Sequence, residues 1–517
     1  MGTQNQLTAR KPVAMFEEDM QQSGLHRVLG KWGLTSLGIG AIIGAGIFVL
    51  TGLAAKNYAG PALALSFVFA GMGCAFAALC YAEFASILPV EGSAYAYSYA
   101  TMGELFAWII GWDLILEYAM ASASVAVGWS AYLGKLMGIF NIHFPLWLMH
   151  DARTAQNMIK EATEKGPQAL ADFSAHYSSI DLPNLFGAPF AFNLPAFLIM
   201  LVVTAILCKG IKEASSTNNL MVILKVSVVL FVIVAGAFYI SPENWTPFIP
   251  ERVIDKDGVG HFGLLGVISG ASYVFFAYIG FDSVSTQAGE AKDPQKDVPF
   301  AIIASLIFCT ILYILVSLVL TGMVKYTDID ITAPIASAFT SKGLNFAALI
   351  ISIAAVAGLT SVLLVMVLGQ TRVFYAMAKD GLLPKMFSYV HPTFKTPTKT
   401  TILTGVLVAF VAAFTPIDDI AKMVNIGTLL AFVMVCASVW IMRYKEPDRV
   451  RPFKTPAIAF VATGGILCNF GMMLSLEWIN WVRLVVWLII GIFIYFIYSK
   501  KHSKLAQYIK DNPDVKF

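Results

Sequence analysis

The sequence predicts an all-α integral membrane protein with twelve transmembrane helices, and three observations carry this prediction. Hydrophobic residues make up 58% of the 517 residues and charged residues only 13%, with a mean hydropathy of +0.72. A soluble protein carries roughly twice that share of charge. Runs with few or no charges recur along the chain, each long enough to cross a bilayer as a helix. Glycines crowd the centre of the first run, where a simple anchor would hold leucine or alanine.

The weakly charged runs define the predicted spans. They cover residues 33–55, 61–88, 97–139, 191–208, 217–240, 263–288, 299–324, 343–377, 400–416, 420–442, 455–476 and 479–499. With a cytoplasmic N-terminus, roughly two thirds of the 35 Lys and Arg residues fall on the cytoplasmic side. We therefore expect a multi-pass protein of the plasma membrane with both termini cytoplasmic. The polar first thirty residues hold no apolar signal core, so the first helix must direct insertion.

Several function classes do not fit the composition. No basic tract with interleaved aromatic residues occurs, so no nucleic-acid partner is expected. The six cysteines lie in apolar runs without metal-ligand spacing, which indicates buried thiols and no metal site. The seven histidines all fall outside the span cores, so no catalytic set forms and an enzyme is not expected. A channel would need repeated polar rings, which are absent from the spans. No cofactor is expected.

The first run contains Gly38, Gly40, Gly44 and Gly46 within residues 35–51. Glycine destabilises a helix, so this segment is expected either to break or to be approached closely by another chain segment. A helix broken within the membrane exposes N–H groups at one half-helix end and carbonyl groups at the other, which suits a small zwitterion. The alternative is a small-residue packing face, since Gly40 and Gly44 are four residues apart.

A second run of this kind lies five spans later. Residues 263–289 combine small residues and aromatic residues with a lone Asp282 in mid-span. Spans 1 and 6 hold matching places in two halves of five, and halves with an odd number of spans face the membrane in opposite orientations. This is the inverted-repeat arrangement of secondary transporters, and it favours a binding site over a packing face.

Five motifs resemble a known family. Gly-Ile-Gly-Ala-Ile-Ile-Gly-Ala-Gly-Ile-Phe-Val-Leu-Thr-Gly at residues 38–52 is similar to the first-helix signature of the amino acid–polyamine–organocation (APC) superfamily. Phe-Phe-Ala-Tyr-Ile-Gly-Phe-Asp at 275–282, followed by Glu-Ala-Lys-Asp-Pro-Gln at 290–295, resembles the sixth-helix signature of its cationic amino acid transporter branch. Residues 111–118 and 372–381 match that branch as well. The resemblance covers about residues 25–500.

The resemblance implies a five-plus-five inverted-repeat (LeuT-like) fold with two extra C-terminal helices and with helices 1 and 6 broken at mid-membrane. The expected parts are a cytoplasmic segment 1–31, a first repeat 32–241 with an extracytoplasmic loop at about 141–190, a second repeat 242–442, helices 11 and 12 in 443–499, and a cytoplasmic tail 500–517.

The two breaks then define an amino acid site. The substrate carboxylate is expected on the N–H groups of Ala45, Gly46 and Ile47, at the positive end of a half-helix. Its ammonium would face the carbonyl groups of Ile42, Phe276, Ala277 and Ile279, at the half-helix C-terminal ends. Ala45 replaces a threonine found in some relatives, which leaves the carboxylate to the backbone alone. The predicted substrate-binding residues are Ile42, Ile43, Gly44, Ala45, Gly46, Ile47, Phe276, Ala277, Ile279 and Met366.

Lys225 is the basic residue deepest in an apolar span, about ten residues or roughly 15 Å from the start of its helix. A charge at that depth is costly. In proton-coupled relatives a lysine on helix 5 occupies the place of a sodium ion, and Lys225 matches it. By this resemblance it reaches the carbonyl ends of the first broken helix and couples transport to protons. The alternative is a structural lysine paired with a carboxylate.

Two further positions complete the expected site. By resemblance, Glu117 on span 3 and Tyr313 on span 7 join a polar network beside the substrate. Met366 in mid-span 8 is bulky and apolar, and it would shorten the side-chain pocket if it faces inward.

The sequence thus predicts a secondary active transporter that imports L-amino acids by alternating access, coupled to protons, with small neutral amino acids favoured. The alternative is an exchanger or uniporter for cationic amino acids on the same fold. The expected partners are the amino acid, H⁺ supplied by the transmembrane proton gradient, and the lipid bilayer, and a small membrane-protein partner is left open.

Overall fold

The computed structural model describes residues 6–12, 15–16, 29–87, 93–185, 187–210, 214–254, 260–286, 288, 291–394 and 396–512. Most of the expected N-terminal segment 1–31, the end of the tail 500–517 and Glu290 of the sixth-helix motif lie outside these residues.

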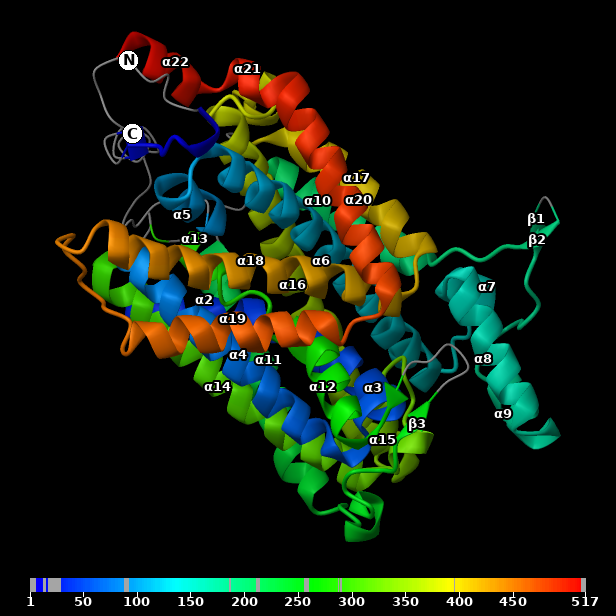
Figure 1. Ribbon diagram of the computed structural model, residues 1–517. Helices are drawn as coiled ribbons and strands as arrows, with labels where there is room; N and C mark the ends of the chain where they lie inside the picture. The colour runs from blue at the N-terminus through cyan, green and yellow to red at the C-terminus, as the bar shows by residue number, and fades with distance from the viewer. Residues whose placement is uncertain are drawn as a thin grey trace.

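Helices dominate the described part of the chain (Figure 1). The longer ones are α4 (Leu63–Ile87), α6 (Glu104–Ile139), α10 (Leu194–Lys209), α11 (Ala214–Ala237), α14 (Pro294–Met323), α16 (Asn345–Lys379), α17 (Thr398–Phe414), α18 (Ile417–Lys445), α19 (Ile458–Leu474) and α20 (Trp478–Ile494). The shorter α-helices are α2 (Lys31–Ile42), α3 (Thr51–Ala54), α5 (Ser93–Thr101), α7 (Leu146–Met149), α8 (Ala152–Glu164), α9 (Pro167–Ser174), α12 (Gly263–Val274), α13 (Ser283–Thr286), α15 (Pro334–Ser341), α21 (Lys500–His502) and α22 (Lys504–Asp511).

Short segments of other types link these helices. The 3₁₀ turns and π-helical segments are η1 (Gln6–Thr8), η2 (Gly46–Leu50), η3 (Ala55–Ala59), η4 (Gly60–Ala62), η5 (Pro242–Trp245), η6 (Phe275–Tyr278), η8 (Tyr326–Asp328), η9 (Lys385–Ser388) and η10 (Tyr495–Ser499). Two small antiparallel hairpins pair β1 (Asn184–Leu185) with β2 (Ala188–Pro189) and β3 (Val253–Ile254) with β4 (Gly260–His261).

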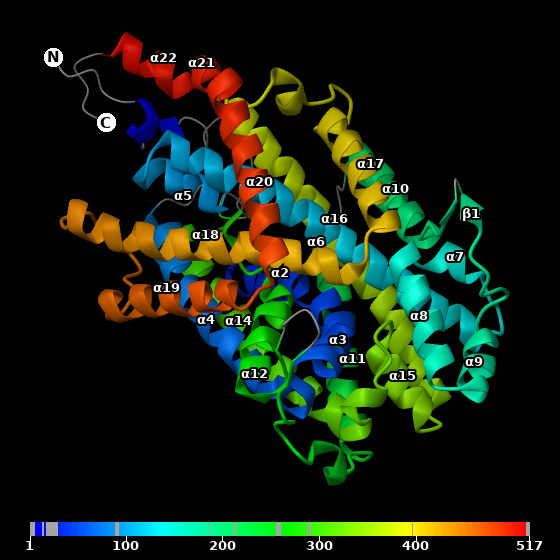
Figure 2. The same cartoon turned by 45° about the vertical axis from the view of Figure 1, so that its right-hand side comes forward.

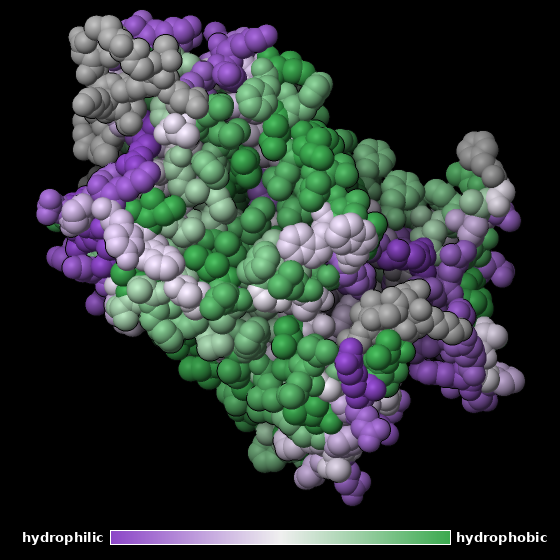
Figure 3. Space-filling model, viewed as in Figure 1, coloured by the Kyte–Doolittle hydropathy of each residue, from purple (hydrophilic) through white to green (hydrophobic). Residues whose placement is uncertain are grey.

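Eight helical stretches of the described chain are long and apolar enough to cross a membrane, and three shorter apolar helices, α10, α17 and α19, accompany them. Hydrophobic residues cover the face over α14, α18, α19 and α20, and hydrophilic residues lie toward its two ends (Figure 3). Apolar side chains exposed in this way belong in contact with lipid, because water would not stabilise so large an apolar surface. The chain is an all-α, multi-pass membrane protein.

The central helices surround α2. This helix lies against α14, α11, α13 and α16. Around it, α16 packs along α6, and α14 packs along α4 (Figures 1 and 2). The C-terminal helices α21 and α22 and the described N-terminal residues lie at one end, called here the terminal end. The opposite end carries the loop helices α7–α9 and is called the loop end. The break after α2 is therefore enclosed by helices from both halves of the chain.

The run 97–139, expected as one long span, is two helices, and this expectation was wrong. α5 ends at Thr101 and α6 begins at Glu104, with Gly103 between them at a φ of +104°. A Cβ atom at Gly103 would lie 2.6 Å from the backbone of Thr8. Glycine therefore permits both the turn and the close passage of the N-terminal segment, which a count of apolar residues does not register.

The long connection after α6 forms a small folded unit at the loop end. Leu146, Ala155 and Ala191 form its buried centre. Two of its helices, α8 and α9, separate just before Pro167. Two ion pairs attach α8 to the rest of the protein: Glu161 accepts from Lys56 at 2.8 Å, and Arg153 donates to Asp419 at 2.6 Å.

Candidate functional site

The first interruption follows α2. The helix ends at Ile42, Ile43 has extended backbone angles (φ −73°, ψ 97°), and helical structure resumes as η2 at Gly46. Ala45, Gly46 and Ile47 thus stand where the resumed helix begins, and the first N–H groups of a helix have no partner inside it. This is the geometry that anion recognition by a half-helix requires.

The second interruption lies between α12 and α13. After α12 the chain forms the single turn η6, and Ile279 is then extended (ψ 132°). Gly280 has a φ of +117°, a conformation that side chains disfavour. A Cβ atom there would also lie 2.9 Å from the carbonyl oxygen of Ala41. The second interruption therefore needs glycine at this position.

The two interruptions touch each other. A Cβ atom at Gly46 would overlap the Cα atom of Ala277, and Gly280 lies against Ala41. Each break thus presents a glycine to the backbone of the other. Half-helix N–H groups from the first break and carbonyl groups from both breaks are held around one place.

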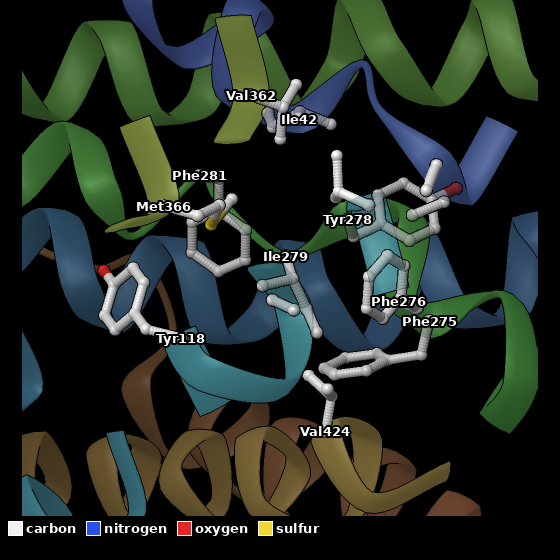
Figure 4. Packing of buried hydrophobic residues seen from close by; sticks show 14 of the residues in the cluster. Ile42, Tyr118, Phe275, Phe276, Tyr278, Ile279, Phe281, Val362, Met366 and Val424 are labelled. Atoms are coloured by element: carbon white, nitrogen blue, oxygen red, sulfur yellow. The ribbon is translucent and has the colours of Figure 1, made fainter. Parts of the chain in front are cut away.

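A small cavity lies at this place. About 10 Å³ is free, close to the room that one water molecule needs. Figure 4 shows Val362 beside Ile42, and Met366 close to Phe281, with Ile279 between these residues and Phe276. The lining residues are Ala41, Ile42, Gly44, Ala45, Gly46, Ala121, Val125, Phe276, Ile279, Val362 and Met366. An amino acid is larger than this space, so binding one requires the lining groups to move apart.

Most of the predicted binding residues reach this cavity. Ile42, Gly44, Ala45, Gly46, Phe276, Ile279 and Met366 line it, whereas Ile43, Ile47 and Ala277 are not among its lining residues.

Sequence reasoning missed four lining residues, all with small or apolar side chains. Ala121 and Val125 follow Glu117 on α6 at steps of four residues, and Val362 precedes Met366 on α16 by four. Residues four apart share one face of a helix. Helical spacing from the two residues already singled out would have found three of the four.

Tyr313 bridges the two interruptions. Its buried hydroxyl lies 2.8 Å from the carbonyl oxygen of Ile42 and 2.9 Å from that of Ala277. These are two of the carbonyl groups expected to receive a substrate ammonium. The tyrosine hydroxyl therefore occupies hydrogen-bonding positions that a substrate ammonium would use or share.

Lys225 reaches the first interrupted helix from α11. Its side chain is fully buried, and its Nζ donates to the carbonyl oxygen of Gly40 at 2.8 Å. Its aliphatic stem passes α16 at Gly358, where a Cβ atom would lie 2.9 Å from the lysine Cγ. Within the described residues, no carboxylate forms an ion pair with Lys225. The hydrogen bond to Gly40 thus connects Lys225 to the carbonyl end of α2.

Glu117 lies in a different environment from the one expected. Its electrostatic neighbours are Asp113 and Asp282, and its hydrogen-bond partner is the Thr428 hydroxyl. One oxygen of Glu117 and both oxygens of Asp113 are buried with no hydrogen-bond partner among the described residues. No hydrogen bond in the described structure links Glu117 to Tyr313. The expected water-containing network of Glu117 and Tyr313 stays a prediction.

A model of the amino acid permease family matches residues 29–508. The chain belongs to this family. The resemblance to the APC superfamily, seen in the motifs, is thereby confirmed. Membership indicates a transporter rather than an enzyme.

Named relatives of this permease differ in what their names say they carry. The chain is 46% identical to a branched-chain amino acid permease of Bacillus subtilis, over 94% of this chain and 96% of the relative. It is 42% identical to a methylthioribose transporter of the same organism, over 96% and 99%. It is 38% identical to cationic amino acid transporter 3 of Arabidopsis thaliana, over 86% and 68%. Similarity to these proteins alone does not select one substrate for this permease.

Proposed function

We propose that this protein is a secondary active transporter that imports L-amino acids by alternating access, coupled to protons, with small neutral amino acids preferred. The observation that carries the proposal is the contact between two interrupted helices around one cavity, Gly46 against Ala277 and Gly280 against Ala41. Such breaks supply backbone groups of both signs of partial charge, which matches the two ends of an amino acid.

Backbone groups make the main substrate contacts in this proposal. The carboxylate binds the N–H groups at Ala45, Gly46 and Ile47, and the ammonium binds carbonyl groups of Ile42, Phe276, Ala277 and Ile279. Tyr313 releases or shares the Ile42 and Ala277 carbonyl groups as the substrate enters. Ile43 and Gly44 lie in the unwound segment that adjusts during binding.

The preference for small neutral side chains is inferred from the lining. Met366 and Val362 on α16 and Val125 on α6 are apolar, and none of the described residues that line the cavity is charged. A cationic side chain would need a carboxylate or open polar room at the far end of the pocket. The relative named as a branched-chain amino acid permease supports a neutral substrate.

Lys225 is proposed as the coupling residue. Protonated, its ammonium ties α11 to the Gly40 carbonyl group and stabilises one access state. Loss of the proton weakens this tie, so proton release and reorientation become linked. Glu117 would serve as a second polar position on α6, near Asp113 and Asp282.

The proposed arrangement has twelve spans in two inverted repeats, residues 32–241 and 242–442, followed by two helices in 443–499. Both termini are placed in the cytoplasm, and the loop 141–190 on the other side of the plasma membrane. The positive-inside distribution of Lys and Arg supports this orientation.

Uptake by the purified protein in liposomes tests the proposal. An inward proton gradient should drive alanine above equilibrium, and an uncoupler should abolish this accumulation. Lys225→Ala should lose accumulation but keep substrate binding, and Lys225→Arg should be equally poor, because guanidinium keeps its proton. Lys325→Ala, at an exposed lysine, is the matched control. Accumulation by Lys225→Ala would overturn the coupling role.

The same assay separates the alternative, an exchanger or uniporter for cationic amino acids. Arginine uptake that ignores the proton gradient, or that needs amino acid inside the liposome, would favour it. Methylthioribose belongs among the competitors, since a relative bears that name. Met366→Ser should admit longer side chains, because one buried side chain is worth ~1.5–3 kcal/mol. Met377→Ser, on the same helix away from the cavity, is its control.

A further inference from the structure

A second hollow lies at the terminal end and shares no lining residue with the cavity at the interrupted helices. It has a volume of about 470 Å³ and opens between the N-terminal turn η1 and the C-terminal helices. Its lining residues are Gln6, Phe496, Lys500, Lys501, Ala506, Gln507 and Lys510. Three lysines, two amides and one aromatic ring thus surround a space with no part in the proposed transport site.

The lysines that line this hollow have no acidic partner in the part of the chain that the structure describes. None of Lys500, Lys501 and Lys510 forms an ion pair there. The buried carboxylate of Glu104 is already occupied, because its oxygens accept from Gln6, Tyr495 and Ser503. The three lining lysines are therefore available to an anion.

Hydrogen bonds hold the walls of the hollow in place. Gln6 Nε2 donates to the Lys500 carbonyl at 2.9 Å, Ser499 Oγ donates to the Leu382 carbonyl at 2.6 Å, and the Lys504 N–H donates to the Asp380 carbonyl at 3.0 Å. The segment that carries the lysines is thus attached to the end of α16 and to η1. The lysine backbone positions are fixed before any ligand binds.

An apolar surface leads to the hollow along α20 and η10. The side chains of Ile489, Phe493 and Ile497 are more than half exposed. Lys500 Nζ lies 5.5 Å from the centre of the Phe496 ring, at the border between apolar and charged residues. Figure 3 shows this border, with hydrophobic residues over α20 and hydrophilic residues over α21 and α22. This is where the acyl region of a bilayer gives way to its headgroups.

We propose that this hollow binds the headgroup of an anionic phospholipid in the leaflet at the terminal end. The phosphate accepts hydrogen bonds from Lys500, Lys501 and Lys510, and the acyl chains lie along Phe493 and Ile497. A free phosphate ester carries similar charge, but only a lipid also covers the exposed apolar side chains. Basic hollows at the ends of transmembrane helices suit anionic headgroups for this reason.

The test measures lipid binding to the purified, delipidated full chain by native mass spectrometry. The parent should retain phosphatidylglycerol in preference to phosphatidylcholine. The triple variant Lys500→Gln, Lys501→Gln, Lys510→Gln should bind phosphatidylglycerol roughly 100-fold more weakly, since each lysine near an anionic headgroup contributes about fivefold. A triple variant with equal charge loss at Lys385, Lys445 and Lys454, which do not line the hollow, should keep the parent affinity.

Other results would overturn the proposal. Equal retention of the two lipids by the parent would remove it, as would equal losses in the two triple variants, which indicate general surface charge. Glycerol phosphate that displaces phosphatidylglycerol at comparable concentration would assign the hollow to a soluble phosphate ester. Lys510→Glu provides a second variant: retained parent affinity in a protein with the parent melting curve would also contradict the assignment.

Discussion

The two ends of the molecule are closed by ion pairs of different kinds. At the terminal end, Glu83 is fully buried and receives Arg443 at 2.7 Å and Arg451 at 3.2 Å, with side-chain exposures of 0% for Glu83 and 4% for Arg451. At the loop end, Glu161 and Arg153 have side-chain exposures of 42% and 56%. Removing one partner of a buried pair costs ~3–5 kcal/mol, whereas exposed pairs contribute about 0–1 kcal/mol.

The ion pairs therefore hold the two ends of the molecule together with different strength. The Glu83 cluster joins α4 to α18 and to the segment after it, and the Thr455 N–H donates to the same carboxylate at 2.8 Å. Lys11 adds a second buried pair with Asp380 at 2.7 Å. The Lys56–Glu161 and Arg153–Asp419 pairs are screened by water and salt, whereas Lys422 at the same end is buried and pairs with Asp418 and Glu477. Separating α8 from the rest of the protein therefore costs less than separating the Glu83 cluster.

The largest effect is expected at Glu83. Glu83→Gln keeps the shape of the side chain but leaves the partly buried Arg443 and Arg451 without their counter-charge. We expect a loss of ~3–5 kcal/mol in the free energy of unfolding, measured by chemical denaturation in detergent. Glu161→Gln at the loop end is the matched control. A similar loss in the free energy of unfolding in both variants would contradict the proposed difference between the two ends.

Next in size is Lys11. It is buried, and its Nζ donates to Asp380, whose other oxygen accepts from Tyr95 at 2.7 Å. Lys11→Met should release the N-terminal segment at a cost of about 3 kcal/mol, so hydrogen exchange in residues 6–12 should accelerate roughly 100-fold. Exchange rates that match those of the parent would mean that the pair adds nothing to the closed end.

An acid effect of intermediate size is expected at the loop end. Burial lowers the pKa of His150 to about 4, against the opposing influence of Asp151 and Asp330. Between pH 6.5 and 4 the unfolded chain takes up a proton that the folded chain does not, so stability falls as the pH falls through this range. At pH 5 the loss is about 2 kcal/mol relative to pH 7.

His150→Gln removes this titration and can keep a hydrogen bond to the Tyr177 hydroxyl, which lies 3.1 Å from His150 Nε2. The variant should therefore lose less stability than the parent between pH 7 and pH 5. Denaturation curves at the two pH values measure the difference. Equal losses in parent and variant would show that His150 is protonated normally in the folded protein.

The smallest effect is expected for the Lys56–Glu161 pair. Burial acts to raise the pKa of Glu161, but hydrogen bonds from Lys56 and Lys165 outweigh it and hold that pKa below the usual value. This stabilisation is present above the usual carboxyl pKa and is lost as the pH falls below it. Glu161→Gln should cost under about 1 kcal/mol.

The salt dependence of stability distinguishes the Lys56–Glu161 pair from the Glu83 cluster. At 1 M salt the Debye length is about 3 Å, so the stability difference between Glu161→Gln and the parent should nearly vanish, while that of Glu83→Gln should persist. Denaturation at low and high salt gives the answer. A Glu161 effect that resists salt would indicate a pair as well shielded as those of the terminal end.

The features that could be predicted from the sequence are those marked by an unusual residue type within a predicted helix. Glycines at 38–46 and at Gly280 break helix preference, and both interruptions are present. Lys225 is a charge in an apolar run, and it meets the first helix at Gly40, close to the carbonyl end where it was expected.

Features made by residues of ordinary type for a membrane helix, or by residues far apart in the sequence, were missed. Ala121, Val125 and Val362 resemble residues that face lipid, because a membrane helix is apolar on every side and shows no inward stripe. The Lys11–Asp380 pair joins residues 369 positions apart. Gly46 was expected to admit a carboxylate, and its contact with Ala277 gives it a packing role as well.

That contact also limits how the transporter can be altered. Because Gly46 abuts Ala277 and Gly280 abuts Ala41, a side chain at either glycine would overlap the backbone of the other interrupted helix. A larger pocket therefore cannot be obtained by substituting at these glycines. It must be obtained on α6 and α16, at Val125, Val362 and Met366, where side chains rather than main chains form the wall.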